Sequence, residues 1–175
     1  MLPWRLRERV SMGYVEKVLL PGEQVVYTTG LHWLVYGRSM LFLALAALLA
    51  LFSITKSTDP SLSPYVEGGL VLAAFFALLG LLSFIGAAIR RASTELAVTD
   101  QRVILKRGVI ARHTIEMNRS KVESVDVDQS VLGRIFGYGT VLVRGTGGSL
   151  EPMQSINDPL RFRSHITADP RAAPR

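Results

Sequence analysis

Histidine, cysteine and serine most often carry catalysis or hold a metal, and in this chain they form no recognisable arrangement. There is no cysteine, which excludes a disulfide framework, a thiolate metal site and a cysteine nucleophile. The three histidines, His32, His113 and His165, are far apart and lack the spacing of metal ligands. No serine is part of a recognisable triad. We therefore expect no cofactor, no metal and no catalytic residue.

An acidic cluster and a glycine-rich run can also be interpreted chemically. Glu123, Asp126 and Asp128 are close in sequence, but on a strand Glu123 faces away from the other two. They therefore do not make the paired carboxylates of an acid–base site. The run from Gly145 to Gly148 lacks the lysine of a phosphate-binding loop and precedes a strand, so it predicts a hairpin turn. The sequence favours a protein that is not an enzyme.

Two apolar runs without charge, Met40 to Ile54 and Gly68 to Ile89, determine where the other segments of the chain lie. A helix of the second run rises about 33 Å, which matches the roughly 30 Å hydrocarbon core of a bilayer. The first run extends backwards past Arg38, whose long side chain can snorkel to the interface. Two buried helices of a soluble domain are the alternative, and these would need a large partner core. We predict transmembrane helices at 33–54 and 68–89, with an external loop at 55–67.

The distribution of cations predicts the orientation of this hairpin. Arginines and lysines precede the first run, and Arg90 and Arg91 follow the second, whereas the loop holds Lys56 as its single cation. The positive-inside rule then places both termini in the cytoplasm. The excess of arginine over lysine and the abundance of alanine indicate a bacterial source, and hence the cytoplasmic (inner) membrane. The cations alternate with acidic residues, so no basic patch for nucleic acid is predicted.

The segments outside the hairpin have the pattern of a small β-rich domain. Residues 1–32 form a cytoplasmic segment with a short helix at 14–20 and a possible edge strand at 23–29. Asn157 is the expected N-cap of a closing helix at 160–166, and residues 167–175 are expected to be a disordered tail. Within the domain at 93–166, period-two alternation predicts strands at 95–98, 102–107, 109–117, 122–127, 140–144 and 149–154.

The stretch from Thr94 to Gly148 contains residues 96–104 (LAVTDQRVI), Arg107-Gly108, residues 121–127 and, most specific of all, Gln129 to Thr140 (QSVLGRIFGYGT). Through these residues it resembles the bacterial pleckstrin-homology-like (PH-like) domain of membrane proteins. Pro21-Gly22-Glu23 and His32-Trp33, followed by two spans, match the layout of the two-span single-domain members. The resemblance implies an α+β membrane protein, with a small bent antiparallel sheet or β-barrel capped by a C-terminal helix. It implies no reaction.

The most specific motif also has a purely structural interpretation. Ser130 can cap one turn of helix that ends at Gly137 and Gly139 in conformations that glycine adopts cheaply. In this interpretation Tyr138 packs or makes a hydrogen bond, and the four apolar side chains of the turn face the sheet; they are Val131, Leu132, Ile135 and Phe136. In a functional interpretation, Arg134 and Tyr138 bind a partner.

These observations predict a membrane-anchored PH-like interaction module that binds a protein, peptide or lipid headgroup at the cytoplasmic surface. Its partners would be the bilayer and another membrane or cytoplasmic protein. Arg90 and Arg91 are candidate lipid-headgroup contacts, at about 1 kcal/mol each. The alternative is a structural subunit of a small membrane complex or transporter in which the hairpin is the working part, although neither apolar run contains an ionisable residue for an ion pathway.

Overall fold

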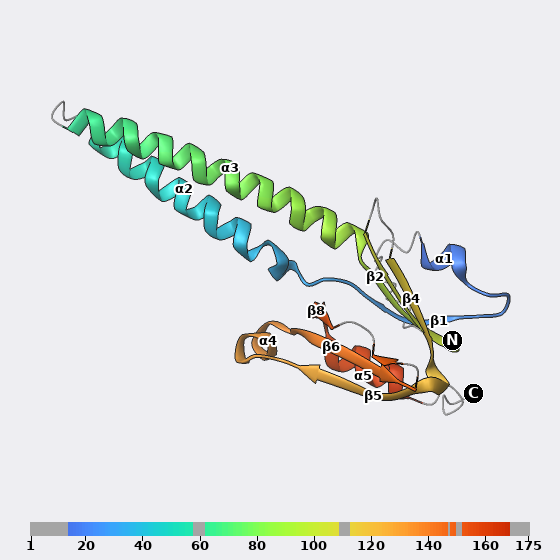
Figure 1. Ribbon diagram of the computed structural model, residues 1–175. Coiled ribbons are helices and arrows are strands. Elements are labelled where there is room, and N and C mark those ends of the chain that lie inside the picture. Colours follow the sequence, from blue (N-terminus) through green and yellow to red (C-terminus); the bar gives the residue numbers. More distant parts are fainter. Residues whose placement is uncertain (1–13, 58–61, 109–112, 147, 150–151, 169–175) are drawn as a thin grey trace, which may run out of the picture. The chain divides into compact units, whose positions relative to one another are not determined.

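The chain folds into two compact units (Figure 1). A computed structural model describes residues 14–57, 62–108, 113–146, 148–149 and 152–168. The described residues up to His32 and those from Arg90 form the first unit, and Trp33–Ile89 form the second. Some residues used in the sequence-based predictions lie outside the described residues. They are the arginines before residue 10, the loop residues 58–61 and the part of the predicted tail from residue 169 onwards.

The second unit is a helical hairpin. A short 3-10 helix, η1 (Trp33–Tyr36), leads into α2 (Gly37–Lys56), and α3 (Ser63–Ser93) runs beside α2 in the opposite direction (Figure 1). The two helices approach closely, because a Cβ atom on Gly69 would lie 2.2 Å from Ser53 Oγ. Large apolar side chains on the outer faces, such as Leu41 and Val71, are exposed. Two stretches, Trp33–Lys56 and Ser63–Ser93, are long and apolar enough to cross a bilayer.

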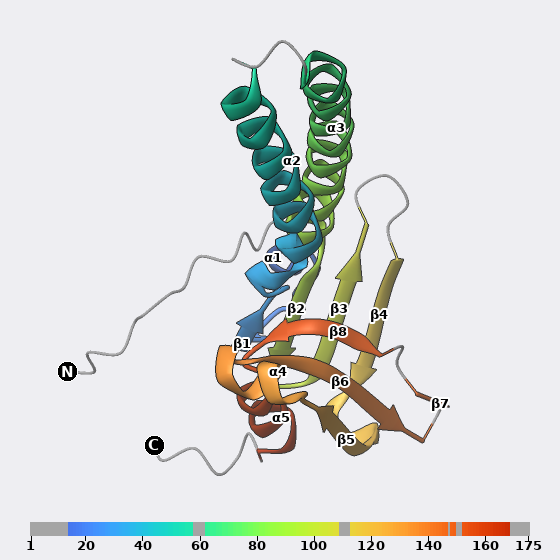
Figure 2. The same ribbon diagram turned by 90° about the vertical axis from the view of Figure 1, so that its left-hand side faces the viewer.

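The first unit contains a four-stranded antiparallel sheet in the order β1-β2-β3-β4. Its strands are β1 (Val25–Thr29), β2 (Glu95–Thr99), β3 (Arg102–Arg107) and β4 (His113–Asn118) (Figure 2). β1 precedes the hairpin in the chain and β2 follows it, yet the two strands pair directly, with Thr28 opposite Ala97. The possible edge strand is therefore part of the sheet.

Both faces of β2 are covered, which explains why the whole strand is buried. Leu96 and Val98 point into the main core. Ala97, on the opposite face, packs with Ile104 and with Val15 of the short helix α1 (Val15–Val18). The segment before the hairpin thus supplies both an edge strand and the cover of one face.

A second antiparallel sheet completes the unit. β5 (Val122–Asp128) pairs with β6 (Tyr138–Gly145), and β6 pairs with β7 (Gly148–Ser149) and β8 (Met153–Asn157). The 3-10 helix η3 (Arg119–Lys121) links the two sheets, α4 (Val131–Phe136) connects β5 to β6, and α5 (Pro159–Thr167) closes the domain. The core between these elements consists of Leu96, Val98, Val103, Leu105, Val141, Val143, Met153, Ile156, Phe162 and Ile166.

This architecture confirms the predicted fold class, with one refinement and two corrections. The strands form two sheets rather than a closed barrel. Asn157 is wrong as the N-cap of the closing helix, because it is the last residue of β8, opposite Tyr138. Asp158 occupies the N-cap position instead, in a left-handed conformation and without a side-chain capping bond. The last predicted strand is also displaced, since β8 begins at Met153 rather than at 149.

Candidate functional site

The turn between β5 and β6 contains the most specific sequence motif, and its ends are fixed by specific contacts. Ser130 Oγ accepts a hydrogen bond of 3.0 Å from the Gly133 backbone, so Ser130 caps α4 as expected. Gly137 ends the helix in the left-handed region, at φ +73°. The Gln129 side chain donates to the Tyr138 carbonyl at 3.0 Å, across the base of the turn. The motif therefore encodes a defined single helical turn.

Gly139 is required for a different reason from the one expected. Its φ is not positive, so the predicted glycine-only conformation is wrong at this position. A Cβ atom there would instead lie 2.7 Å from the Asp128 carbonyl oxygen. Because that contact is with backbone, the neighbouring strand cannot yield easily. Close approach of β5 and β6 at the base of α4 is what excludes a side chain.

The apolar side chains of α4 do not face the sheet, and this expectation is wrong. Val131 is 76% exposed, Ile135 69%, Leu132 58% and Phe136 47%. The buried member of the turn is Gly133, where an added Cβ would lie 2.6 Å from the Tyr138 carbonyl oxygen. The helix therefore places its glycine against the domain and its apolar side chains outward.

Tyr138 and His32 connect this turn to the chain segment that precedes the first span. Their rings stack at a centroid distance of 5.4 Å, and the buried His32 also makes a hydrogen bond to the Phe136 backbone. The His32 backbone N–H donates to the Ser155 carbonyl of β8 at 2.7 Å. Tyr138 is thus a packing residue as well as a candidate contact.

Burial lowers the pKa of His32 below its ordinary value of 6.5. The hydrogen bond to the Phe136 backbone and the charge of Asp158 oppose this shift, whereas the Arg91 charge adds to it. His32 is therefore held in its neutral form in the folded domain. Its electrostatic interaction with Arg91 also shows that the end of α3 lies near this ring.

The predicted site residues differ in how much of each side chain is available. Arg134 is exposed on α4, whereas Tyr138 is half-buried against His32. Arg90 and Arg91 are exposed at the end of α3. The His32 ring contacts the Phe136–Tyr138 end of the turn, and the charge of Arg91 acts on it. The predicted partner-binding and lipid-contact residues thus belong to neighbouring parts of the first unit.

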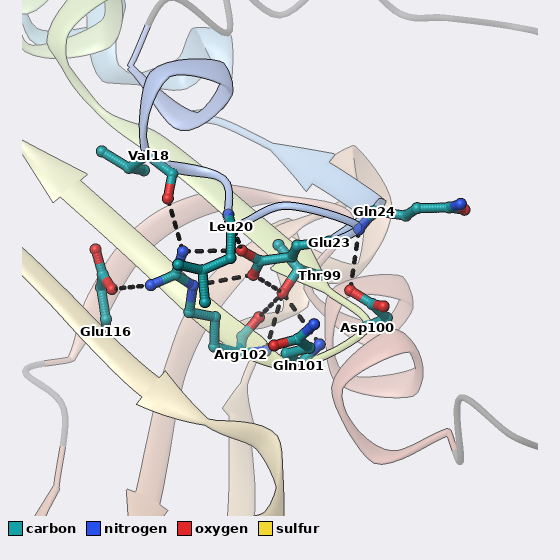
Figure 3. A network of polar contacts seen from close by, with 9 residues as sticks. All are labelled: Val18, Leu20, Glu23, Gln24, Thr99, Asp100, Gln101, Arg102 and Glu116. Carbon is teal, nitrogen blue, oxygen red and sulfur yellow. Dashed lines mark hydrogen bonds and ion pairs between the residues drawn. The ribbon is translucent and has the colours of Figure 1, made fainter.

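A second constellation, around Glu23, ties the segment before the hairpin to the sheet (Figure 3). The fully buried Glu23 carboxylate receives two hydrogen bonds from Arg102, Nη2 to Oε2 at 2.8 Å and Nε to Oε1 at 2.9 Å. Thr99 Oγ1 donates to the same carboxylate at 2.7 Å, and the Leu20 backbone N–H donates at 2.8 Å. Every contact of this carboxylate in Figure 3 is with a donor.

Arg102 is satisfied equally well. Its Nη2 also donates to the Val18 carbonyl at 2.7 Å, and its Nη1 contacts Glu116 Oε2 at 2.5 Å (Figure 3). Burial raises the pKa of Glu23, but the hydrogen bonds from Arg102, Leu20 and Thr99 outweigh it, so the net pKa lies below 4.5. The hydrogen bond to Glu23 raises the pKa of Arg102 further above its ordinary value. Both groups are therefore ionised at neutral pH.

A smaller polar cluster holds the start of α1. Glu95 of β2 accepts hydrogen bonds from the Tyr14 and Val15 backbones at 3.2 and 3.4 Å, and Lys106 Nζ lies 2.8 Å from its other oxygen. Lys106 also lies 5.3 Å from the centre of the Tyr14 ring. Together with the Glu23–Arg102 pair, this cluster fixes the segment at both ends of α1.

Sequence reasoning noticed the Pro21-Gly22-Glu23 turn but missed its ionic partner. Glu23 and Arg102 are 79 positions apart, so no local spacing links them. A charged residue directly before an apolar run, as Arg102 is before Val103–Leu105 in β3, was the available signal. A buried carboxylate then had to be sought among residues near a turn.

The remaining titratable residues of the described part of the chain form no group that could hold a metal. Among the described residues, no three histidine, aspartate or glutamate side chains are placed to share a metal ion. His165 stacks on Tyr27 at 4.4 Å, and His113 is exposed at the start of β4. In the acidic cluster, Asp126 forms an exposed ion pair with Arg144 at 3.1 Å.

Two membrane-length helices and a two-sheet domain closed by a C-terminal helix define a membrane protein that carries a PH-like domain. A family model described as a bacterial PH domain matches residues 27–169, and the chain belongs to this family. The resemblance noticed in the sequence is thereby confirmed. This class of membrane protein is not a known class of enzyme.

One relative has been described from Bacillus subtilis (strain 168), the UPF0699 transmembrane protein YdbT. It is 24% identical over 80 residues, which cover 46% of this chain and 15% of that protein. No solved structure matches. The likeness to YdbT supports a transmembrane protein, and the family match supports the PH-like domain.

Proposed function

We propose that this protein is a membrane-anchored interaction module whose PH-like domain binds a protein, peptide or lipid headgroup at the membrane surface. The observation that carries the proposal is the pairing of β1 with β2. Because β1 precedes the first span and β2 follows the second, the domain is joined to both ends of the hairpin. Such a double connection holds a binding surface close to the bilayer.

The same pairing bears on topology. Two strands that hydrogen-bond must lie in one compartment, so both ends of the hairpin share one side of the membrane. The cations beside the hairpin favour the cytoplasm as that side. Reporters fused after Arg175 and before Trp4 should both be cytoplasmic. Labelling of a C-terminal tag by an impermeant reagent in intact bacterial cells would contradict this orientation.

Within the domain, the proposed partner contact is the exposed side of α4 around Arg134. Tyr138 holds the turn in place by stacking on His32. Arg90 and Arg91 are proposed to attract anionic headgroups. None of these side chains is required for the main core, which is built from other residues. Arg134, which is exposed on α4, can therefore bind a partner without loss of the fold, whereas Tyr138 also packs on His32.

Site-specific photocrosslinking in the native membrane tests this proposal. A photoreactive amino acid replaces Arg134 in the full-length protein, and the matched control carries it at the exposed Ser120 of η3, at the other end of β5. A discrete adduct from position 134, absent from position 120, is expected. Equal adduct patterns at the two positions would contradict the proposed binding surface.

The second candidate function is a structural subunit of a membrane complex, and the close helix approach at Ser53 and Gly69 is the observation that favours it. The exchange of residues 33–89 for an unrelated two-span hairpin separates the two functions. If the domain is the working part, the position-134 adduct persists after the exchange. If the hairpin is the working part, the adduct is lost.

A further inference from the structure

The exposed apolar face of α4 is unusual for a domain whose core is otherwise closed. Val131, Leu132, Ile135 and Phe136 are all between 47% and 76% exposed, although they belong to a turn of six residues. Contiguous exposed apolar side chains of this kind mark a binding or membrane surface rather than ordinary surface variation. We refer to these four side chains as the α4 face.

The connections of His32 place the α4 face near the point where the chain enters the membrane. His32 makes a hydrogen bond to the Phe136 backbone and stacks on Tyr138, and Trp33, the next residue, begins the first membrane-length stretch. The end of α4 thus lies beside the last residue before the first membrane-length stretch.

Charge at this end of the domain fits an anionic lipid surface. Arg134 is exposed on α4 itself, and Arg91, whose charge acts on His32, ends the second membrane-length helix. An apolar face flanked by arginine is the composition of segments that lie in the bilayer interface. The occupant that best matches both the apolar and the cationic side chains is therefore lipid.

We propose that α4 is a second membrane contact of this protein, with the α4 face inserted among the headgroups of the bilayer that the hairpin crosses. The inserted turn would fix the orientation of the domain on the membrane. The inference deepens the proposed function by naming the bilayer as the partner of α4, and it rests on that function only in placing the domain at the membrane.

The absence of cysteine makes a direct test possible. Full-length Ile135→Cys is labelled with an environment-sensitive fluorophore and placed, one copy per particle, in nanodiscs of phosphatidylcholine and phosphatidylglycerol. Quenching by spin-labelled lipid is compared with quenching by aqueous iodide. The matched control is Ser120→Cys, which lies at the opposite end of β5 from α4, and Leu132→Cys repeats the measurement at a second position of the face.

The proposal predicts that labels at 135 and 132 emit at shorter wavelength and lose intensity with spin-labelled lipid, whereas the label at 120 responds to iodide. Labels at 135 and 132 that respond to iodide as the control does would overturn it. Labels shielded from both quenchers would overturn it too, since protein would then cover the face. These discs contain no candidate partner protein from the native membrane, so the result is independent of the photocrosslinking test of partner capture.

Discussion

Two regions of the PH-like domain depart from the usual distribution of residues, in opposite directions. At Glu23 and Arg102, charged groups are buried, and hydrogen bonds satisfy both of them. At α4, large apolar side chains are exposed although a core lies a short distance away. The first departure serves the fold, because each charge is needed by the other. The second does not, because Val131, Leu132 and Ile135 are more than half exposed in the described part of the domain.

The comparison shows where stability and binding are separated in this small domain. The Glu23–Arg102 pair helps the β1–β2 pairing and the Glu95 cluster to fasten the segment before the hairpin to the sheet, and this segment leads directly into the first span. Ser130, Gly137 and Gly139 hold the α4 turn on the side that faces the domain. Its outward-facing side chains are therefore not needed to fix the turn. Substitutions in the two regions should therefore have very different costs.

The largest effect is expected from Arg102→Ala. This change leaves the buried Glu23 carboxylate without its guanidinium partner, which typically costs about 3–5 kcal/mol of unfolding free energy. Arg144→Ala is the matched control, because Arg144 forms an exposed ion pair with Asp126 and should cost less than about 1 kcal/mol. Denaturant unfolding of the full chain in detergent, followed by the circular dichroism of the strands, measures both. Equal losses of unfolding free energy in the two variants would show that the buried ion pair contributes no more to stability than the exposed one.

Substitutions at the base of α4 should have the next largest effect. Gly139→Ala forces a Cβ against the Asp128 carbonyl at 2.7 Å and should cost about 1–3 kcal/mol. Gly137→Val should cost more than about 1 kcal/mol because a β-branched residue tolerates a positive φ poorly. Gly137→Asn is the control, since asparagine adopts the left-handed region more readily, and it should be milder. A melting temperature unchanged in Gly139→Ala and Gly137→Val would disprove these roles.

The sequence predicted the positions of the strands better than the pairing between strands or between charged residues. The apolar pattern located β2, β3 and β5 closely, because each strand packs apolar side chains against the main core, and β2 and β3 also bury Ala97 and Ile104 on the opposite face. The pairing of β1 with β2 stayed open, since 60-odd intervening residues of hairpin give no local signal of register. The Glu23–Arg102 pair was missed for the same reason.

The error at α4 has a different physical origin. The pattern of Val131, Leu132, Ile135 and Phe136 was correctly interpreted as one apolar helix face, but an apolar face does not state what it packs against. In a soluble domain the core is the default answer. In a domain tethered to a membrane there is a second apolar phase, and sequence periodicity cannot distinguish the two.

Acid should weaken the two regions in different pH windows. Folding favours the neutral form of His32. The contribution of His32 to the unfolding free energy is therefore complete above pH 6.5 and declines as the pH falls below that value. The ionised form of Glu23 is favoured, so its contribution is present above 4.5 and is lost as the pH falls through the lower pKa of the folded state. Unfolding free energies measured from neutral to acidic pH should therefore decline in two steps. His32→Asn should remove the first step, and its persistence in that variant would assign it to another group.

The smallest effect on stability is expected on the α4 face itself. Ile135→Ser and Val131→Ser remove side chains that are already mostly solvated in the isolated domain, so each should change the unfolding free energy by less than about 0.5 kcal/mol. Val143→Ser, in the fully buried core, is the matched control and should cost several times more. Thermal unfolding of the full chain in a detergent that keeps the hairpin soluble compares the three variants. A loss at Ile135 as large as the loss at Val143 would mean that α4 is covered by the protein's own chain, and the contrast between the two regions would then fail.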